Sequence, residues 1–186
     1  MKTIGMIGGI SWKSTATYYR VMNEAAQKRL GGLHAVRCVL WSFDFAEIEE
    51  RQHRGAWTEL TAMMVSAARR LEGAGADFLI ICANTMHRMA EEVEAEIGIP
   101  LLHIADATAG AIRNAGLRRV GLLGTRFTME EAFYRARLER LHGLEVLIPG
   151  ETDRQTVDEV IYRELCAGRV TTQARERYGA VIRRLI

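Results

Sequence analysis

Short apolar runs alternate along the chain with longer stretches whose apolar residues recur at helical spacing. The run Phe78-Leu79-Ile80-Ile81 contains no polar residue, which is typical of a strand covered on both faces of a parallel sheet. Strands are predicted over residues 3–7, 36–41, 77–82, 99–104, 120–123 and 144–148. Helices are predicted over 14–30, 58–72, from Cys82 to Ile97, from Asp106, from Thr128 to near Gly143, over 153–167 and over 172–186.

The order of these elements indicates the fold class. Strands and helices that alternate with short breaks favour an α/β fold with parallel sheets flanked by helices. In such folds, ligands bind at the carboxyl ends of the strands. The segments that follow three predicted strands are therefore the first candidates for a binding site: residues 8–11, 82–85 and 124–128.

The glycines after the first strand leave two interpretations open. Gly5, Gly8 and Gly9 do not have the spacing of the dinucleotide-binding fingerprint, and no phosphate-loop lysine motif is present. A tight turn from strand to helix needs glycine for its conformational freedom. Backbone amides at such a turn can also face a small anion, and the two interpretations are compatible.

Cys82 is the principal candidate for chemistry because it ends a buried strand. A free cysteine is most often a small buried apolar residue, which is our interpretation of Cys38 and Cys166. At a strand end beside a helix start, however, we expect the thiol pKa to be lowered towards thiolate. Asn84 and Thr85 offer neutral hydrogen bonds to a carboxylate, and His87 is placed to contact the thiolate or to cap the helix.

A second polar segment follows the predicted strand at 120–123. Thr128 and Glu131 have the spacing of a capping box, so Thr128 is predicted to be a helix N-cap. Thr125 has no such structural role in the pattern, and we expect it to bind a carboxylate. Arg126 can pair with an anion, although a loop arginine is usually solvated.

Composition and charge exclude several classes of function. The formal net charge is +2, and the arginines are interspersed with acidic residues, which argues against a nucleic-acid partner. Three cysteines without short spacing predict neither a disulfide framework nor a zinc site, and they favour a reducing compartment. The apolar N-terminal run is too short for a signal peptide or a membrane span. We therefore expect a cytoplasmic protein without a membrane partner.

The sequence resembles the aspartate/glutamate racemase family, in particular its broad-specificity amino-acid racemase branch. The most specific match is CANTMH at 82–87, in register with the glycine-containing start of the chain. The resemblance extends from the first residue to the last. The other matching pieces are IGMIGGISW (4–12), Ser14-Thr15, Tyr18-Tyr19, DFAEI (44–48) and GTRFTM (124–129).

The resemblance implies a fold and a mechanism. It implies two Rossmann-like lobes, here 1–104 and 105–186, with the active site in the cleft between them. It also implies an amino-acid racemase that uses neither cofactor nor metal and in which one thiol removes the α-proton while a second protonates the opposite face. The implied binding partner is a small-molecule amino acid. Because members of the family often form dimers, the resemblance also implies a homodimer. The implied catalytic residue is Cys82, and the implied substrate-binding residues are Ser11, Asn84, Thr85, Thr125, Thr128 and, for a side-chain carboxylate, Gln52 or Arg54.

The family carries its second thiol on a strand beyond the helix predicted at 172–186, and returns a last helix to its first half. Neither is found among these residues, and Cys166 in a helix interior is a poor substitute. We therefore expect the chain to be short at its C-terminus, its second lobe to be incomplete, and normal racemase activity to need a second thiol.

Two rival functions remain from the sequence. The first is a decarboxylase or isomerase of a small dicarboxylate that uses a single cysteine. The second is a shortened, non-catalytic chain that binds a small carboxylate or a partner subunit. Product analysis with several amino acids separates racemase from decarboxylase, and binding without turnover supports the third interpretation.

Overall fold

The computed structural model describes all residues, 1–186, and the chain divides into two units, Met1–His103 and Ile104–Ile186. The division into two lobes at 104/105, which the sequence predicted, stays a prediction. The elements of the first unit are β1 (Thr3–Gly8), α1 (Trp12–Leu30), β2 (Arg37–Ser42), α2 (Phe45–His53), α3 (Trp57–Gly73), β3 (Phe78–Ile81), the 3₁₀ helix η1 (Thr85–Met89) and α4 (Ala90–Ala95). Those of the second unit are α5 (Ile104–Asn114), β4 (Arg119–Gly121), α6 (Arg126–Glu130), α7 (Ala132–His142), β5 (Glu145–Leu147), α8 (Glu151–Val160), the π-helix η2 (Ile161–Leu165) and α9 (Thr172–Leu185).

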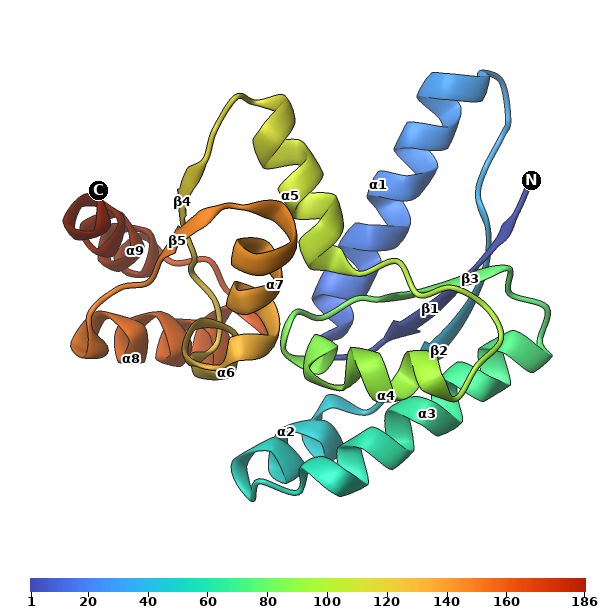
Figure 1. The fold of residues 1–186 in the computed structure, drawn as a ribbon, viewed down its shortest axis with the longest axis horizontal. Helices are drawn as coiled ribbons and strands as arrows, with labels where there is room; N and C mark the ends of the chain where they lie inside the picture. Colours follow the sequence, from blue (N-terminus) through green and yellow to red (C-terminus); the bar gives the residue numbers. More distant parts are fainter. The chain divides into compact units, whose positions relative to one another are not determined.

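The first unit is built on a three-stranded parallel sheet in the order β2-β1-β3. Helix α1 lies on one face of this sheet, and α2, α3 and α4 lie on the other (Figure 1). Successive side chains of a strand point to opposite faces. Accordingly Met6 packs near Tyr18 and Met22 of α1, whereas Ile7 packs in the larger core with Leu60 and Met64 of α3.

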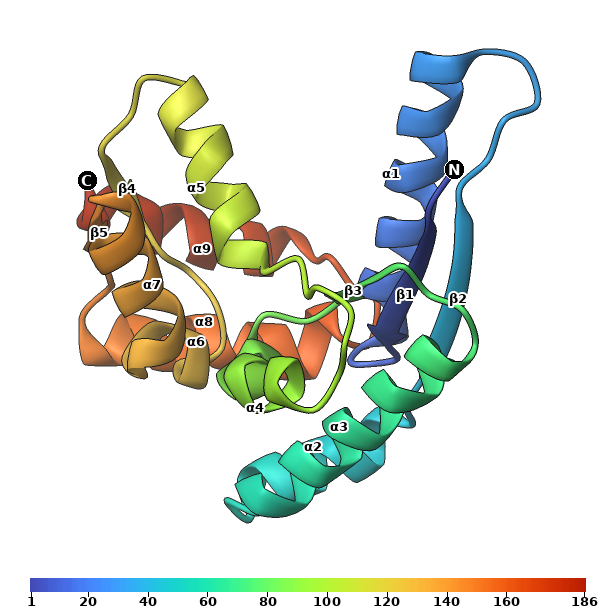
Figure 2. The same cartoon turned by 45° about the vertical axis from the view of Figure 1, so that its right-hand side comes forward.

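The two faces of this sheet are covered unequally. The α3 face is sealed by a large cluster in which Leu60, Met64 and Leu79 are completely buried. On the α1 face, a single helix covers the strands, and Thr15 is the only buried residue of α1. The carboxyl ends of β1 and β3 meet at the edge of the sheet where α1 begins (Figure 2). The segment after Cys82 therefore lies against the first turn of α1.

The second unit contains a two-stranded parallel sheet, β4-β5. Its core has two clusters. One joins α5 and α7 to the strands through Ala109, Leu138 and Val146. The other joins α6, α8 and α9 through Met129, Val157 and Val181, which are all completely buried.

The predicted α/β class with parallel sheets flanked by helices is confirmed. Several predicted elements were wrong in detail: the helix predicted from Thr128 to near Gly143 is divided into α6 and α7, and α2 was not predicted. The run at 99–104 forms no strand: Leu101 makes one isolated bridge to Leu79, because Pro100 has no amide hydrogen for a ladder and α5 already begins at Ile104.

Two further differences concern helices. The helix predicted from Cys82 to Ile97 is divided into η1 and α4 and ends at Ala95. The helix predicted over 153–167 is α8 followed by the π-helical turn η2. None of the helices combines the length and the apolar character that crossing a membrane demands.

Candidate active site

The turn after β1 is a tight strand-to-helix connection. Gly9 has φ +84°, and a Cβ at this position would meet the backbone of Phe43, including its carbonyl carbon at 2.9 Å. The Gly9 amide donates to the Thr15 hydroxyl at 2.9 Å. The turn interpretation of these glycines is therefore supported. The Gly9 amide is already engaged within the protein, so the structure gives no support to that group as an anion donor.

Helix α1 begins at this turn, and Ser11 is its N-cap. The Ser11 hydroxyl accepts from the Lys13 amide at 3.3 Å, and the side chain is buried. Capping satisfies one of the amides that the first turn of a helix leaves unpaired. The structure thus places Ser11 near the end of β1, as the sequence predicted, and gives it a structural role there.

Cys82 lies directly after β3, and its amide donates to the Ile7 carbonyl at 2.8 Å. Its side chain is 1% exposed and belongs to the cluster of Met6 and Ile80 on the α1 face. Burial raises the pKa of the Cys82 thiol to about 12. The expectation of a lowered pKa was wrong for this state, because removal of the thiol from water disfavours the thiolate and the next turn is only a 3₁₀ helix.

Two side chains hold the backbone that follows the thiol. The Ser14 hydroxyl lies 2.9 Å from the Cys82 carbonyl, and it also lies 2.8 Å from the Ser11 carbonyl. One residue further on, the His87 Nδ1 lies 2.9 Å from the Ala83 carbonyl. His87 was a candidate from the sequence, whereas Ser14 had no predicted role, since nothing local indicates a contact between residues 68 positions apart.

Asn84 and Thr85 open the 3₁₀ helix η1. Asn84 is its N-cap residue by position, yet its side chain makes no capping hydrogen bond. The backbone carbonyl of Asn84 accepts from the His87 amide at 3.0 Å. Thr85 is buried at 5% exposure. The Asn84 side-chain amide is thus not used for capping, and its role in binding remains a prediction.

Gln52 reaches the same segment from α2. Its side chain is 3% exposed, and its Nε2 lies 3.3 Å from the sulfur of Met86. Arg54, the alternative to Gln52 in the sequence analysis, is half exposed and pairs with Glu50 and Glu59. The first unit therefore brings Gln52 next to the 82–87 segment and leaves Arg54 in an exposed ion-pair cluster.

Two buried histidines adjoin this segment. The rings of His87 and His103 are 4.6 Å apart between centroids, and the side chains are 2% and 3% exposed. A carbonyl oxygen can only accept, so the contact with Ala83 requires a hydrogen on the Nδ1 of His87. His103 was not predicted, and its only sequence signal is a histidine at the end of an apolar run.

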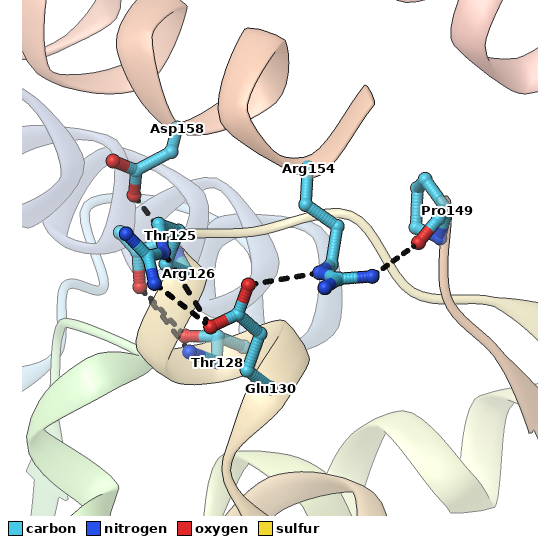
Figure 3. A network of polar contacts seen from close by, with 7 residues as sticks. All are labelled: Thr125, Arg126, Thr128, Glu130, Pro149, Arg154 and Asp158. Carbon is cyan, nitrogen blue, oxygen red and sulfur yellow. Dashed lines mark hydrogen bonds and ion pairs between the residues drawn. The ribbon is translucent and has the colours of Figure 1, made fainter. Parts of the chain in front are cut away.

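In the second unit, Thr125 rather than Thr128 caps a helix. Thr125 is the N-cap of α6: its hydroxyl accepts from the Thr128 amide at 3.3 Å. Thr128 lies inside α6 and is 2% exposed, with its hydroxyl 3.1 Å from that of Thr125 (Figure 3). The prediction that Thr128 caps the helix with Glu131 was wrong, because α6 begins at Arg126 and the next helix begins only after Glu131.

The remaining polar groups of this segment connect α6 to α8. The Arg126 amide donates to the Asp158 carboxylate at 2.8 Å, and Glu130 accepts from Arg154 at 2.9 Å (Figure 3). The hydrogen bond from Arg154 lowers the pKa of the Glu130 carboxyl. The Arg126 guanidinium lies 3.3 Å from Glu130, so it is engaged in an ion pair. This network fixes α6 and with it the Thr125 position.

The structure contains no group of three or more histidine, cysteine, aspartate or glutamate side chains that could hold a metal ion. The chemical groups at the first-unit segment are a thiol, hydroxyls, amides and imidazoles. Such a set can bind a small carboxylate and can transfer a proton at the sulfur.

The structure is an α/β protein in which a cysteine-containing segment follows a parallel strand. This segment, residues 82–87, is the one that most specifically resembles the racemase family. The sequence profile of the Asp/Glu/hydantoin racemase family matches residues 7–186, so the chain belongs to this family.

Individual relatives of this chain are also described as racemases or racemase homologues. The broad-specificity amino-acid racemase RacX of Bacillus subtilis (strain 168) is 28% identical over 149 residues, which are 77% of this chain and 63% of RacX. The matched part thus spans less than two thirds of that relative. A Yersinia pestis crystal structure, provisionally described as an Asp/Glu racemase, is 49% identical with a TM-score of 0.89 and covers 100% of this chain and 80% of its own. An aspartate racemase homologue from Pyrococcus horikoshii OT3 is 34% identical with a TM-score of 0.77, covering 91% of this chain and 74% of its own.

Proposed function

We propose that this chain is an amino-acid racemase that works without a cofactor, favours acidic substrates, and uses the Cys82 thiol as an acid and base at the α-carbon. The observation that carries the proposal is the placement of Cys82 at the carboxyl end of β3, with Asn84 and Thr85 directly after Ala83. Membership of the racemase family supports it.

The proposal gives Cys82 a specific role. Because burial raises the pKa of its thiol to about 12, Cys82 holds its proton at neutral pH. A neutral thiol is the proton donor for one enantiomer, and microscopic reversibility makes the same sulfur the base in the opposite direction.

The proposal requires a second proton carrier on the opposite face of the α-carbon, and Cys38 does not fill that place. Cys38 is in register with Ile4 on β1, and Ile4 with Phe78 on β3, so Cys38 is level with Phe78. Four residues of strand separate that level from Cys82, a distance of roughly 13 Å.

The proposed substrate contacts are with polar groups that follow the strands. Asn84 and Thr85 would bind the α-carboxylate, and Ser11 would line the same site. Gln52, beside Met86, would meet a side-chain carboxylate. For Thr125 and Thr128 of the second unit we propose a carboxylate-binding role in addition to their contact with each other.

The test is product analysis by chiral chromatography. L-aspartate, L-glutamate and several neutral amino acids are incubated separately with the protein and with Cys82→Ser. The proposal predicts the D-enantiomer from at least one acidic amino acid in a protein that also carries the second thiol, and a loss of at least about a hundredfold in its Cys82→Ser variant. Decarboxylated products, or binding without turnover, would instead support one of the two rival functions.

A further inference from the structure

The two peptide groups that follow Cys82 are each held by a side chain. The Cys82 carbonyl accepts from Ser14 of α1, and the Ala83 carbonyl accepts from His87 of η1, both at 2.9 Å. The preceding peptide group is held as well, because the Cys82 amide donates to Ile7 of β1 at 2.8 Å. The backbone on both sides of the Cys82 α-carbon is therefore fixed by groups outside its own segment.

The Ser14 hydroxyl has one hydrogen and two carbonyl neighbours. Both the Ser11 and the Cys82 carbonyl can only accept, so the hydrogen serves one of them at a time or is shared between them. The Ser11 carbonyl has two further donors on Thr15, its amide at 3.4 Å and its hydroxyl at 3.3 Å. The Ser14 hydrogen can therefore turn to Cys82 while Ser11 remains satisfied.

Fixing a carbonyl fixes more than one atom. A peptide group is planar and trans, so its N–H points opposite to its C=O. The contacts with Ser14 and His87 consequently direct the amides of Ala83 and Asn84 away from those two side chains. The direction of the Cys82 α-carbon to β-carbon bond, which points the thiol, follows from the same peptide planes.

We propose that Ser14 is a positioning residue for the Cys82 thiol, acting through the Cys82 carbonyl, and that His87 supports it through the Ala83 carbonyl. The inference rests on the proposed function, in which Cys82 transfers the proton. Acid and base groups lose efficiency when their geometry is displaced by as little as an ångström. The His87 ring is suited to this role because it is buried against His103 and so cannot easily turn.

The alternative is that Ser14 only bonds back to its own helix. Thr17 provides the matched control, because its hydroxyl donates to the Lys13 carbonyl of the same helix at 3.1 Å and reaches no other element. If helix back-bonding were the whole role of Ser14, then Ser14→Ala and Thr17→Ala should behave alike. Ser14→Thr keeps a hydroxyl at the position and is the conservative rescue variant.

The experiment compares wild type, Ser14→Ala, Ser14→Thr and Thr17→Ala with two measurements. The first is steady-state racemisation of the amino acid that the wild type turns over best, separated into kcat and KM. The second is the rate of Cys82 alkylation by iodoacetamide, followed by mass spectrometry, which needs no turnover. Far-ultraviolet circular dichroism confirms that each variant is folded.

We expect Ser14→Ala to lower kcat by roughly three- to tenfold with a smaller change in KM, and to accelerate Cys82 alkylation by a similar factor, because one hydrogen bond no longer opposes opening of the segment. Ser14→Thr should retain most of the wild-type values, and Thr17→Ala should equal wild type. His87→Ala should act in the same direction as Ser14→Ala, and His87→Asn, whose amide nitrogen replaces Nδ1, should recover part of the loss.

Wild-type kcat and wild-type alkylation in Ser14→Ala would overturn the inference, as would equal losses in Ser14→Ala and Thr17→Ala. The alkylation measurement separates this inference from the proposed function. If the wild type neither racemises an amino acid nor exchanges its α-hydrogen, the proposed function fails, while faster alkylation in Ser14→Ala alone still supports the positioning of Cys82 by Ser14.

Discussion

At the scale of single residues, burial of the Cys82 thiol links its protonation to folding. The pKa is about 12 in the folded chain against an ordinary value of 9.0. Below pH 9 both states hold the proton. Above it, the unfolded chain loses the proton first, so the stability that the protonated thiol contributes is lost as pH rises from 9 towards 12.

The prediction is that the unfolding free energy of the wild type falls more steeply with alkaline pH than that of Cys82→Ser. The extra slope approaches about 1.4 kcal/mol per pH unit once the unfolded thiol is ionised. Urea unfolding between about pH 8 and pH 10.5 measures it, and any pH-independent cost of the substitution cancels in the slope. Parallel pH dependences would mean that Cys82 is not desolvated.

At the scale of elements, the strand-to-helix turn at Gly9 sets where α1 begins. Gly9 needs both its positive φ and the absence of a Cβ beside Phe43. Gly31, at the other end of α1, has φ +76°, but a Cβ added there would meet no atom within 4 Å. The two glycines therefore separate conformational strain from close approach.

Gly9→Ala should lower the free energy of unfolding by at least about 2 kcal/mol, since the strained backbone and the collision with Phe43 add. Gly31→Ala should cost less, on the order of 1–3 kcal/mol from the backbone alone, because φ +76° with ψ 179° is a conformation that only glycine readily adopts. Denaturant unfolding of both variants gives the comparison. An equal cost at the two positions would show that the Phe43 backbone yields easily, and that the turn does not fix the start of α1.

The N-cap of α6 gives a second prediction at this scale. Thr125→Val removes the oxygen that accepts from the Thr128 amide, and it should lower the stability of the protein by about 1 kcal/mol. Thr125→Ser keeps the cap and should be close to wild type. Thermal unfolding of the two variants measures this difference in stability. When aspartate binding by Thr125→Val is measured, Thr125→Ser serves as the reference variant. Equal stability of the Val and Ser variants would exclude capping by Thr125.

At the scale of the whole molecule, the fold class followed from the sequence because local pattern carries it. A continuous apolar run such as Phe78–Ile81 predicts a strand covered on both faces, whatever its position in the sheet. The sequence alone also selects Gln52 and Cys82 as candidates, although the contact of Gln52 with Met86 depends on how α2 packs.

The errors arose where a tertiary contact decides. The Cys82 pKa depends on burial in a cluster that Tyr18 and Met22 of a distant helix help to form, and no local pattern reports that desolvation. The helix cap could not be chosen from spacing, since Thr125 and Thr128 both precede a polar residue by three positions. Ser14 escaped notice because its partner Cys82 is adjacent only in the folded chain.

The central claim is that the Cys82 sulfur transfers the α-proton of an amino acid, and proton exchange with solvent tests it most directly. L-glutamate and L-aspartate are incubated in deuterated water with wild type and with Cys82→Ser, and the α-hydrogen signal is followed by NMR. The account predicts that the wild type replaces the α-hydrogen of at least one of them by deuterium, and that Cys82→Ser does so at least about a hundredfold more slowly. Exchange at the wild-type rate in a folded Cys82→Ser protein, or no exchange by the wild type, would contradict it.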